Sequence, residues 1–266
     1  MNIDEIRAAF DEQVRRNASV LEPGVAAISA APGVLRELAT PGQGLSCITW
    51  TELDEHCADE VIAAQVDFFG SRGESFEWKL FGYDQPADLG QRLLKAGFVP
   101  DDEEVMLVAE TARIATDVAP PDGIRLVEVI DEAGVEAATT VHEDLEPGSP
   151  RRARHVNRLL AALADERRPM ATVVAWAGDE PVSSARVDFG PGPDFAGLFS
   201  GATMAGWRGR GIYRAIVAYR ARLAAARGYK YLRVETSVMS RPILRRLGFE
   251  PVGVTTPYVW KPAKSG

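Results

Sequence analysis

Arginine and glycine alternate in a short segment whose composition is suited to binding an anion: residues 207–214 read WRGRGIYR. The small and apolar run from Phe195 to Met204 predicts a strand before this segment. After it, apolar residues recur four, three and four positions apart from Ile212 to Leu223, which predicts one face of a helix. Backbone N–H groups at a helix start lack intrahelical partners and lie at the positive end of the helix dipole. Because glycine has no Cβ atom to keep a ligand away, the sequence predicts a phosphate or pyrophosphate site here.

Positive charge is concentrated around this turn. Residues 206–230 contain seven Arg or Lys and no Asp or Glu, whereas the whole chain has a net charge of −8. Basic side chains beside a helix start favour a polyanionic ligand. A solvated basic helix face is an alternative that accounts for the arginines after Arg214, but less readily for Arg208 and Arg210. For the glycines, the alternative is a tight turn with no ligand.

Length and composition restrict the remaining possibilities. The 266 residues, 46% of them apolar, suffice for one large domain or two medium ones. The net negative charge argues against a nucleic-acid partner, and no apolar run is long enough for a membrane partner. Cys47 and Cys57 are not spaced as metal ligands, and the three histidines are scattered, so no metal is predicted. The amphipathic start at Ile3 is not a signal peptide, so we expect a cytoplasmic protein.

Two α/β segments are predicted on either side of a proline-containing linker. The expected domains are residues 1–112 and 124–266, with the linker at 113–123, where Pro120 and Pro121 exclude a helix or a central strand. Periodicity and turn residues predict the elements. Helices are expected over 3–18, 54–69, 88–96, 131–144, 150–167, from 212 onward, and over 242–247. Strands are expected over 34–38, 45–50, 76–81, 105–108, 124–129, 170–177, 181–189, 195–204, 231–235, 252–254 and 258–260.

The two halves end with similar sequences. Each has Arg-Gly, a predicted strand, a short helix, Gly-Phe-x-Pro and a further strand, with Gly97-Phe98 in the first half and Gly248-Phe249 in the second. This predicts two copies of one α/β unit, although chance similarity of two strand–helix–strand segments remains an alternative. The stretch Leu53–His56 aligns with the glycine-rich turn, yet it is acidic and has no glycine. We therefore expect the first copy to lack the anion site.

The order of strand, glycine-rich turn, helix, strand and short helix ending in Leu247-Gly248-Phe249 resembles the GNAT (GCN5-related) N-acetyltransferase superfamily. The signature of that family, Gln/Arg-x-x-Gly-x-Gly/Ala, is matched by Arg208-x-x-Gly211, but Tyr213 stands where the last small residue is expected. The resemblance covers about residues 124–260, with a fainter repeat over 20–110. It implies two tandem GNAT-like units, each a mixed, mostly antiparallel sheet flanked by helices, of which the first is degenerate.

The resemblance also implies how acetyl-CoA would bind as co-substrate. Backbone N–H groups of the turn would hold its pyrophosphate, and the preceding strand, with a bulge near Gly201, would pair with the pantetheine arm. Ser240 lies near the place where the family contacts that arm, but it is equally a helix N-cap. The residues so implied are Ala202, Thr203, Met204, Arg208, Gly209, Arg210, Gly211, Ile212, Tyr213, Arg214 and Ser240.

Catalytic residues are only partly implied. In the family an amine attacks the thioester directly, a carboxylate takes its proton, and a tyrosine often protonates the departing thiolate. Leu244 occupies the position of that tyrosine, and residues 199–206 contain no carboxylate. Glu235 is the first candidate for the base and Asp188 the second. Tyr213 or Tyr258 are alternatives for the missing acid.

We therefore expect an acyl-CoA-dependent N-acetyltransferase that acts on an amine of a small molecule or protein, as a monomer or homodimer. The alternative is a catalytically silent protein that binds or senses acyl-CoA, and the missing tyrosine and strand carboxylate favour it. An amine that has already lost its proton to solvent needs no strong base on the protein, and this favours the hypothesis of an active acetyltransferase.

Overall fold

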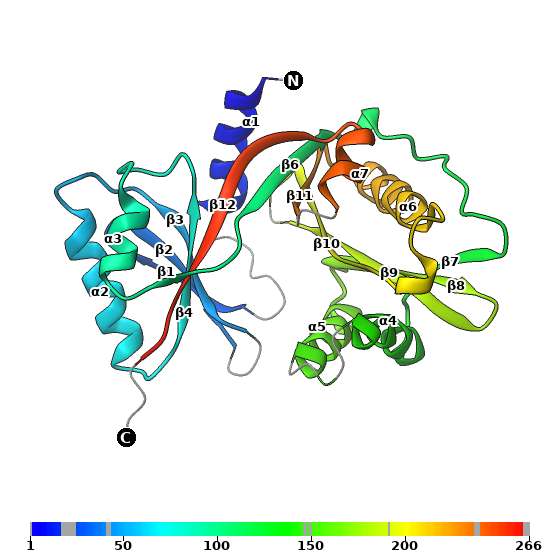
Figure 1. The fold of residues 1–266 in the computed structure, drawn as a ribbon, viewed down its shortest axis with the longest axis horizontal. Coiled ribbons are helices and arrows are strands. Elements are labelled where there is room, and N and C mark those ends of the chain that lie inside the picture. The colour runs from blue at the N-terminus through cyan, green and yellow to red at the C-terminus, as the bar shows by residue number, and fades with distance from the viewer. Residues whose placement is uncertain are drawn as a thin grey trace. The chain divides into compact units, whose positions relative to one another are not determined.

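The computed structural model describes residues 2–16, 25–40, 44–145, 148, 151–190, 192–236 and 240–262. The chain forms two compact units, Met1–Met106 with Pro251–Gly266 and Leu107–Glu250. Each unit combines a sheet with helices (Figure 1). Among the described residues, no helix has both the length and the apolar character needed to span a membrane.

The first unit is built on a mixed sheet. Its strands run in the order β1-β2-β3-β4-β12, all antiparallel except for the parallel pair β3–β4, and β5 adds to β12. The helices are α1 (Ile3–Phe10), a π-helical turn η1 (Asp11–Arg15), α2 (Ala58–Gly70) and α3 (Leu89–Lys95). The strands are β1 (Val25–Ala31), β2 (Val34–Ala39), β3 (Ser46–Thr51), β4 (Phe76–Phe81), β5 (Val99–Pro100) and β12 (Glu250–Trp260).

The core of the first unit lies between its sheet and α2. Ile62 and Phe69 are seven residues apart, about two helical turns, so they share one face of α2. That face packs on the buried side chains Ile48 and Trp78 of the sheet. Phe69 stacks on Phe76, with 4.1 Å between the ring centroids. The apolar periodicity of the sequence thus fixes which side of α2 is buried.

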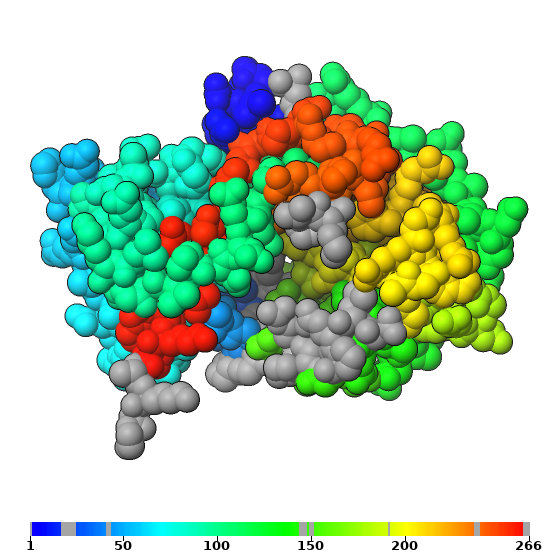
Figure 2. Space-filling view, in the orientation of Figure 1, coloured from blue at the N-terminus to red at the C-terminus, as the bar shows by residue number. Residues whose placement is uncertain are grey.

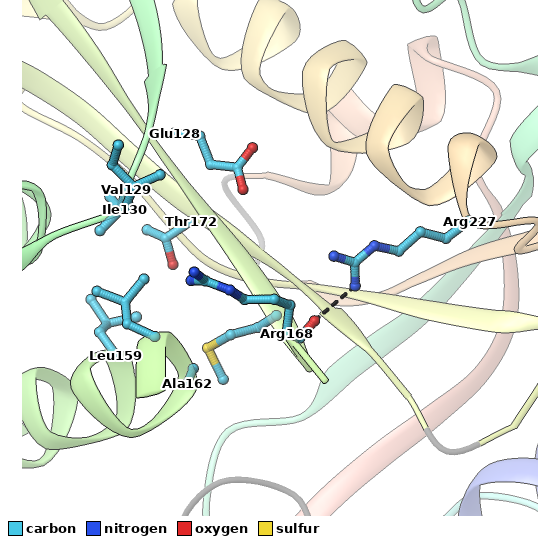
Figure 3. Close-up of a pocket in the computed structure, with 10 residues that line it drawn as sticks. Glu128, Val129, Ile130, Leu159, Ala162, Arg168, Thr172 and Arg227 are labelled. Atoms are coloured by element: carbon cyan, nitrogen blue, oxygen red, sulfur yellow. Dashed lines mark hydrogen bonds between the residues drawn. The ribbon is translucent and has the colours of Figure 1, made fainter. Parts of the chain in front are cut away.

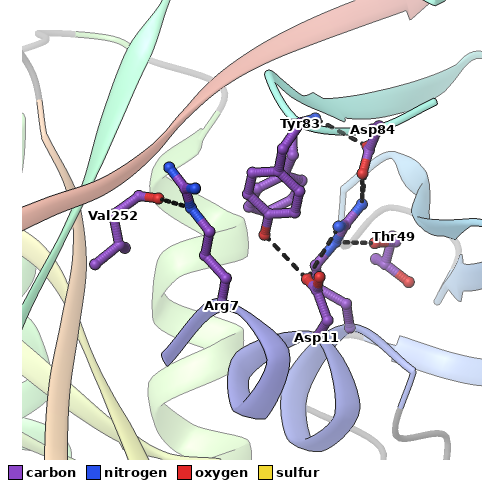
Figure 4. A network of polar contacts seen from close by, with 8 residues as sticks. Arg7, Asp11, Thr49, Tyr83, Asp84 and Val252 are labelled. Carbon is purple, nitrogen blue, oxygen red and sulfur yellow. Dashed lines mark hydrogen bonds and ion pairs between the residues drawn. The ribbon is translucent and has the colours of Figure 1, made fainter. Parts of the chain in front are cut away.

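A buried polar network joins η1 to the sheet of the first unit (Figure 4). The Arg15 side chain donates to the Thr49 carbonyl O (3.0 Å), to Asp11 Oδ1 (3.0 Å) and to both oxygens of Asp84 (2.9 Å). Its Cζ lies 3.9 Å from the Phe81 ring centroid. Tyr83 donates its hydroxyl to Asp11 Oδ1 (3.0 Å). Every charge in this network therefore has an opposite charge or a hydrogen-bond partner beside it.

The second unit has the same pattern. Its strands run in the order β11-β10-β9-β8-β7, antiparallel except for the parallel pair β10–β11, and β6 follows β11. The strands are β6 (Glu104–Glu110), β7 (Ile124–Glu128), β8 (Met170–Ala177), β9 (Glu180–Phe189), β10 (Phe195–Thr203) and β11 (Tyr231–Thr236). The α-helices are α4 (Glu132–Leu145), α5 (Arg151–Ala164), α6 (Ile212–Ala226) and α7 (Arg241–Arg246). Two 3₁₀ turns are η2 (Thr111–Arg113) and η3 (Ala205–Trp207).

Helices cover both faces of the second sheet, with α4 and α5 on one side and α6 on the other (Figure 1). Successive residues of a strand point to opposite faces, and β8 shows this directly. Val174 packs with α4 and α5, whereas Val173 packs with Ile212 and Ile216 of α6. The strand β8 is therefore largely apolar on both sides, in keeping with a sequence in which Thr172 is the one polar residue.

The last strand of the second sequence half, β12, belongs to the first unit, and the last strand of the first half, β6, runs from the first unit into the second. β12 pairs with β4, with Tyr258 opposite Trp78. The chain crosses from the first unit to the second within β6, and Thr111 N–H, just after that strand, donates to the Lys230 carbonyl O (2.8 Å). The unit boundary therefore falls at Pro251, whereas the sequence places the second domain at 124–266. The physical reason is the nonlocal pairing of β12, which no local pattern encodes.

Most predicted elements are present, and the mixed, mostly antiparallel sheets are confirmed in both units. The strand β1 is absent from the sequence prediction because its residues, VAAISAA, do not alternate in polarity. Two predicted strands at 252–254 and 258–260 form the single strand β12. The end of the first predicted helix, residues 17–18, lies outside the described residues.

Candidate functional site

The glycine-rich turn lies where the sequence predicts it, between β10 and α6. Gly211 is the N-cap of α6 with φ +86°, and Gly209 has φ +75°. A Cβ atom at Gly209 would meet nothing within 4 Å, so the left-handed backbone, not crowding, requires glycine. Ala215 N–H donates to the Gly211 carbonyl O (3.2 Å), which closes the first helical turn. No side chain caps α6, so its first N–H groups are available to an anion.

The basic side chains of the turn are exposed around these N–H groups. Arg208 Nε donates back to the Thr203 carbonyl O (3.0 Å), and the Arg210 guanidinium lies over the Trp207 ring, 4.7 Å from its centroid. Arg208, Arg210 and Arg214 are all exposed. The yellow surface of η3 and the turn after it is open to solvent on the face shown in Figure 2. An anion here would therefore meet both the helix N-terminus and positive side chains.

The equivalent helix start in the first unit is already occupied by its own carboxylate. Asp54 Oδ1 accepts from the N–H groups of His56 and Cys57, both at 2.9 Å, just before α2. These hydrogen bonds, that of Cys57 first, hold the pKa of the exposed Asp54 carboxyl below its usual value. An external phosphate would have to displace this carboxylate and would be repelled by it. The expectation that only the second copy has an anion site is consistent with this geometry.

Strands β10 and β11 are paired over only three residues. Phe195, Ala196 and Gly197 pair with Tyr231, Leu232 and Arg233, whereas β10 continues to Thr203 and β11 to Thr236. A bulge between Phe199 and Ala202 bends β10 further, and Ser200 within it has φ +50°. A bulge changes the direction of a strand and can end its hydrogen bonding to a neighbouring strand. The main chain of β10 beyond Gly197 is thus free of β11 and turned toward the glycine-rich turn.

The predicted pantetheine-binding residues of β10 are held from the β9 side. The Ala202 carbonyl O accepts from Ser183 Oγ (2.6 Å), and the same hydroxyl lies 2.8 Å from Thr203 Oγ1. Met204 N–H donates to the Val182 carbonyl O (3.0 Å). These bonds fix the strand segment while its other edge remains unpaired with β11. An extended ligand with amide groups could pair with that edge.

The structure also places the remaining predicted residues. Ile212 is buried, and the Tyr213 ring lies against the bulge, where a Cβ atom on Gly201 would be 3.1 Å from Tyr213 Cε2. Tyr213 therefore does not narrow the approach to the turn, which explains how a large residue fits the last signature position. Ser240 is at the N-cap of α7. Tyr258, in the first unit, packs against Gly90 of α3.

The two candidate bases differ in their surroundings. Asp188 on β9 is 7% exposed, and its Oδ1 accepts from Arg186 Nε (2.8 Å), so its charge is engaged. Glu235 is half-buried on β11, two residues beyond the last residue paired with β10. It shares a sheet face with Arg233 because side chains alternate along a strand. Glu235 is therefore the carboxylate placed beside the opened strands.

Three site residues were not identified from the sequence. Phe199 lies on β10 with the guanidinium carbons of Arg186 and Arg233 each 5.1 Å from its ring centroid. These residues come from three neighbouring strands, so no local spacing indicates their contact. Leu244, at the position of the expected tyrosine, is fully buried in the second unit and offers no acid.

A pocket of about 210 Å³ lies at the opposite end of α6 from the glycine-rich turn (Figure 3). Apolar side chains of α5 form one wall, and Arg168 extends across it toward Thr172. Arg227, at the end of α6, donates from Nη1 to the Arg168 carbonyl O (2.7 Å). None of the predicted site residues lines this pocket. Across the described residues, no group of three or more His, Cys, Asp or Glu could hold a metal ion.

No family model matches the sequence, and no curated protein matches it either. Solved structures do resemble the chain. A GCN5-related N-acetyltransferase from Kribbella flavida is 16% identical, with 97% of this chain and 95% of that chain covered and a TM-score of 0.69. A tandem GNAT protein of the clavulanic acid biosynthesis pathway, solved without acetyl-CoA, is 12% identical over 88% of this chain and 79% of that chain, with a TM-score of 0.63.

A third structure, a GCN5-related N-acetyltransferase from Sphaerobacter thermophilus, is 12% identical, with coverages of 86% and 76% and a TM-score of 0.61. Because these sequence identities are low, the similarity to the solved structures establishes the fold alone. The chain has the tandem GNAT fold, so the fold class expected from the glycine-rich turn and the repeat is confirmed.

Proposed function

We propose that this chain is an acyl-CoA-dependent N-acetyltransferase that moves an acetyl group from acetyl-CoA to an amine. The observation that carries the proposal is the uncapped start of α6, with two left-handed glycines, directly after a strand that separates from its parallel neighbour. The turn would hold the pyrophosphate, and β10 from Ala202 to Met204 would hold the pantetheine arm. Residues 124–250 with the end of β6 would form the working unit, and the first unit would have no such site.

Calorimetry with acetyl-CoA tests the binding site. Gly211→Asp places a carboxylate on the N–H groups of α6, as Asp54 does in the first unit, and we expect at least about 10-fold weaker binding from like-charge repulsion. Gly211→Asn is the matched control, because asparagine is nearly isosteric and tolerates the left-handed backbone without the charge. Gly228→Asp, at the other end of α6 with φ +82° and an open surrounding, should bind like the parent. Equal affinities for Gly211→Asp and Gly211→Asn, or no binding by the parent, would contradict the proposal.

For the chemistry, we propose Glu235 as the group that accepts the proton of the attacking amine. Its place on β11, two residues beyond the last residue paired with β10, supports this role. Thiol release from acetyl-CoA, measured with a panel of small amines and lysine peptides, should fall in Glu235→Gln while acetyl-CoA affinity stays unchanged. Unchanged turnover in Glu235→Gln with a loss in Asp188→Asn would transfer the role to Asp188.

A second candidate is a catalytically silent acyl-CoA-binding or sensing protein. Two observations favour it, the buried Leu244 in place of a proton donor and the absence of a carboxylate from Phe199 to Gly206. Tight acetyl-CoA binding with no thiol release from any amine in the panel would support the sensor. We place either function in the cytoplasm, in keeping with the two free thiols Cys47 and Cys57.

A further inference from the structure

A buried arginine lies directly beneath the bulge of β10. Arg220 is only 1% exposed, whereas Arg214 and Arg222 on the same helix are exposed. Its spacing explains the burial, because Arg220 stands four residues after Ile216 and seven after Tyr213, on the side of α6 that faces the sheet. The basic segment is therefore not uniformly a solvated helix face.

The charge of Arg220 has no ion-pair partner among the described residues. Nη1 donates to the Arg186 carbonyl O (2.9 Å) and Nε to the Ile216 carbonyl O (3.4 Å). Nη2 is buried and makes no regular hydrogen bond within the described part of the chain. Burial lowers the pKa of Arg220, and the nearby Tyr213 and Asp188 oppose that effect. Arginine stays protonated at neutral pH even so, which leaves a positive charge in a low-dielectric surrounding.

The position of this charge coincides with the opening between the strands. Arg186, whose carbonyl receives Nη1, pairs with Phe199, the last residue of β10 in register before the bulge. Two residues earlier, Gly197 makes the last pair with β11. The guanidinium therefore binds the β9 residue that pairs with β10 just beyond the point where β10 separates from β11. Tyr213 and Asp188 offset the burial of this charge only in part, so keeping it here opposes folding.

We propose that Arg220 supplies a fixed positive charge beneath this opening that stabilises the negative charge formed there during acyl transfer, in place of a proton-donating side chain. This inference rests on the proposed function. The amine nitrogen attacks the thioester carbonyl carbon, and the carbonyl oxygen becomes negative. When that intermediate collapses, the carbon–sulfur bond breaks, its electron pair leaves on sulfur as the CoA thiolate, and the amine proton passes to Glu235. Preorganised charge lowers the energy of both anions without a proton transfer from the protein, so Leu244 need not be a tyrosine.

The thiol of bound CoA reports this charge without knowledge of the acceptor. We expect that thiol, followed by thiolate absorbance during a pH titration of the complex, to ionise at lower pH than in free CoA. Arg220→Met should raise its pKa by about one unit or more, the effect of removing a nearby opposite charge. Arg220→Gln keeps an N–H donor but not the charge and should do the same, whereas Arg220→Lys should retain most of the lowered value. Arg222→Met removes an exposed charge from the same helix and should leave the thiol unchanged.

A thiol pKa in Arg220→Gln equal to that of the parent, in a folded variant that binds CoA, would overturn the role of Arg220. So would a parent complex whose thiol ionises as it does in free CoA. Absence of CoA binding by the parent in calorimetry would instead refute the proposed function, and with it this inference. The two failures are distinguishable because affinity and thiol ionisation are measured separately.

Discussion

Replacing Arg15 by methionine should strongly destabilise the first unit. Its side chain is 3% exposed and holds two carboxylates, Asp84, 4% exposed, and Asp11, 18% exposed. Methionine fills a similar volume but removes the positive charge beside both carboxylates and the donor to the Thr49 carbonyl O, so that Asp11 keeps only the Tyr83 hydroxyl and Asp84 only the Phe81 N–H among these donors. Removing one partner from a buried ion pair costs about 3–5 kcal/mol, because the other charge stays buried and unpaired. We expect a loss of that size in the free energy of unfolding.

A second arginine provides a matched comparison. Arg152 also bridges two carboxylates, Glu136 (2.7 Å) and Glu143 (2.8 Å), but its side chain is 39% exposed. Arg152→Met should therefore cost only about 0–1 kcal/mol, since solvent replaces the lost contacts. Urea unfolding monitored by tryptophan fluorescence and circular dichroism measures both variants. Equal losses for Arg15→Met and Arg152→Met would refute the reasoning, because burial is the main difference between the two clusters.

The pH dependence adds a further check on the first variant. Burial raises the pKa of Asp84, and Arg15 lowers it in part. Without Arg15, that pKa should rise further. A group whose pKa is raised in the folded state favours folding below that pKa and disfavours it above. The deficit of Arg15→Met relative to the parent should therefore shrink as the pH falls through this raised value. A deficit that grows at low pH would contradict the assignment.

Three smaller predictions concern individual side chains. Burial, and after it the charges of His142, Arg186 and Arg158, lower the pKa of His155 to about 4. The stability that neutral His155 contributes should therefore be lost as the pH falls from about 6.5 toward 4. Urea unfolding of His155→Gln should show no such loss. Hydrogen bonds from Arg167 lower the pKa of Asp165 to about 2, and carboxyl NMR of Arg167→Ala should return it to near 4. Because burial raises the pKa of Cys47 well above its usual value, a thiol reagent at neutral pH should label Cys57 faster than Cys47.

Local patterns in the sequence predicted the glycine-rich turn and the helix that follows it. The turn at 207–214, its two glycines with positive φ and the start of α6 at Ile212 are where the pattern indicates. At the acidic stretch Leu53–His56, the Asp54 carboxylate accepts hydrogen bonds from backbone N–H groups at the start of α2, which is consistent with the expectation that the first copy lacks an anion site. The apolar face of α6 was only partly predicted, since its buried side is centred on alanines and includes Arg220.

Other features depended on partners far away in the chain. The orientation of Tyr213 is set by Gly201 on another element, and the contacts of Phe199 come from β9 and β11. The membership of β12 in the first unit is set by its pairing with β4. Residue type alone did not indicate any of these outcomes.

Glycine backbone freedom, helical periodicity and the exposed N–H groups of a helix start are local properties, so the sequence alone located the glycine-rich turn and identified the tandem repeat. Strand exchange, the early end of the β10–β11 pairing and the burial of Arg220 beneath the bulge depend on register between distant segments. Register is fixed by the packing of whole sheet faces against each other. For this reason only the tertiary structure shows where β10 separates from β11 and that Arg220 is buried near that point.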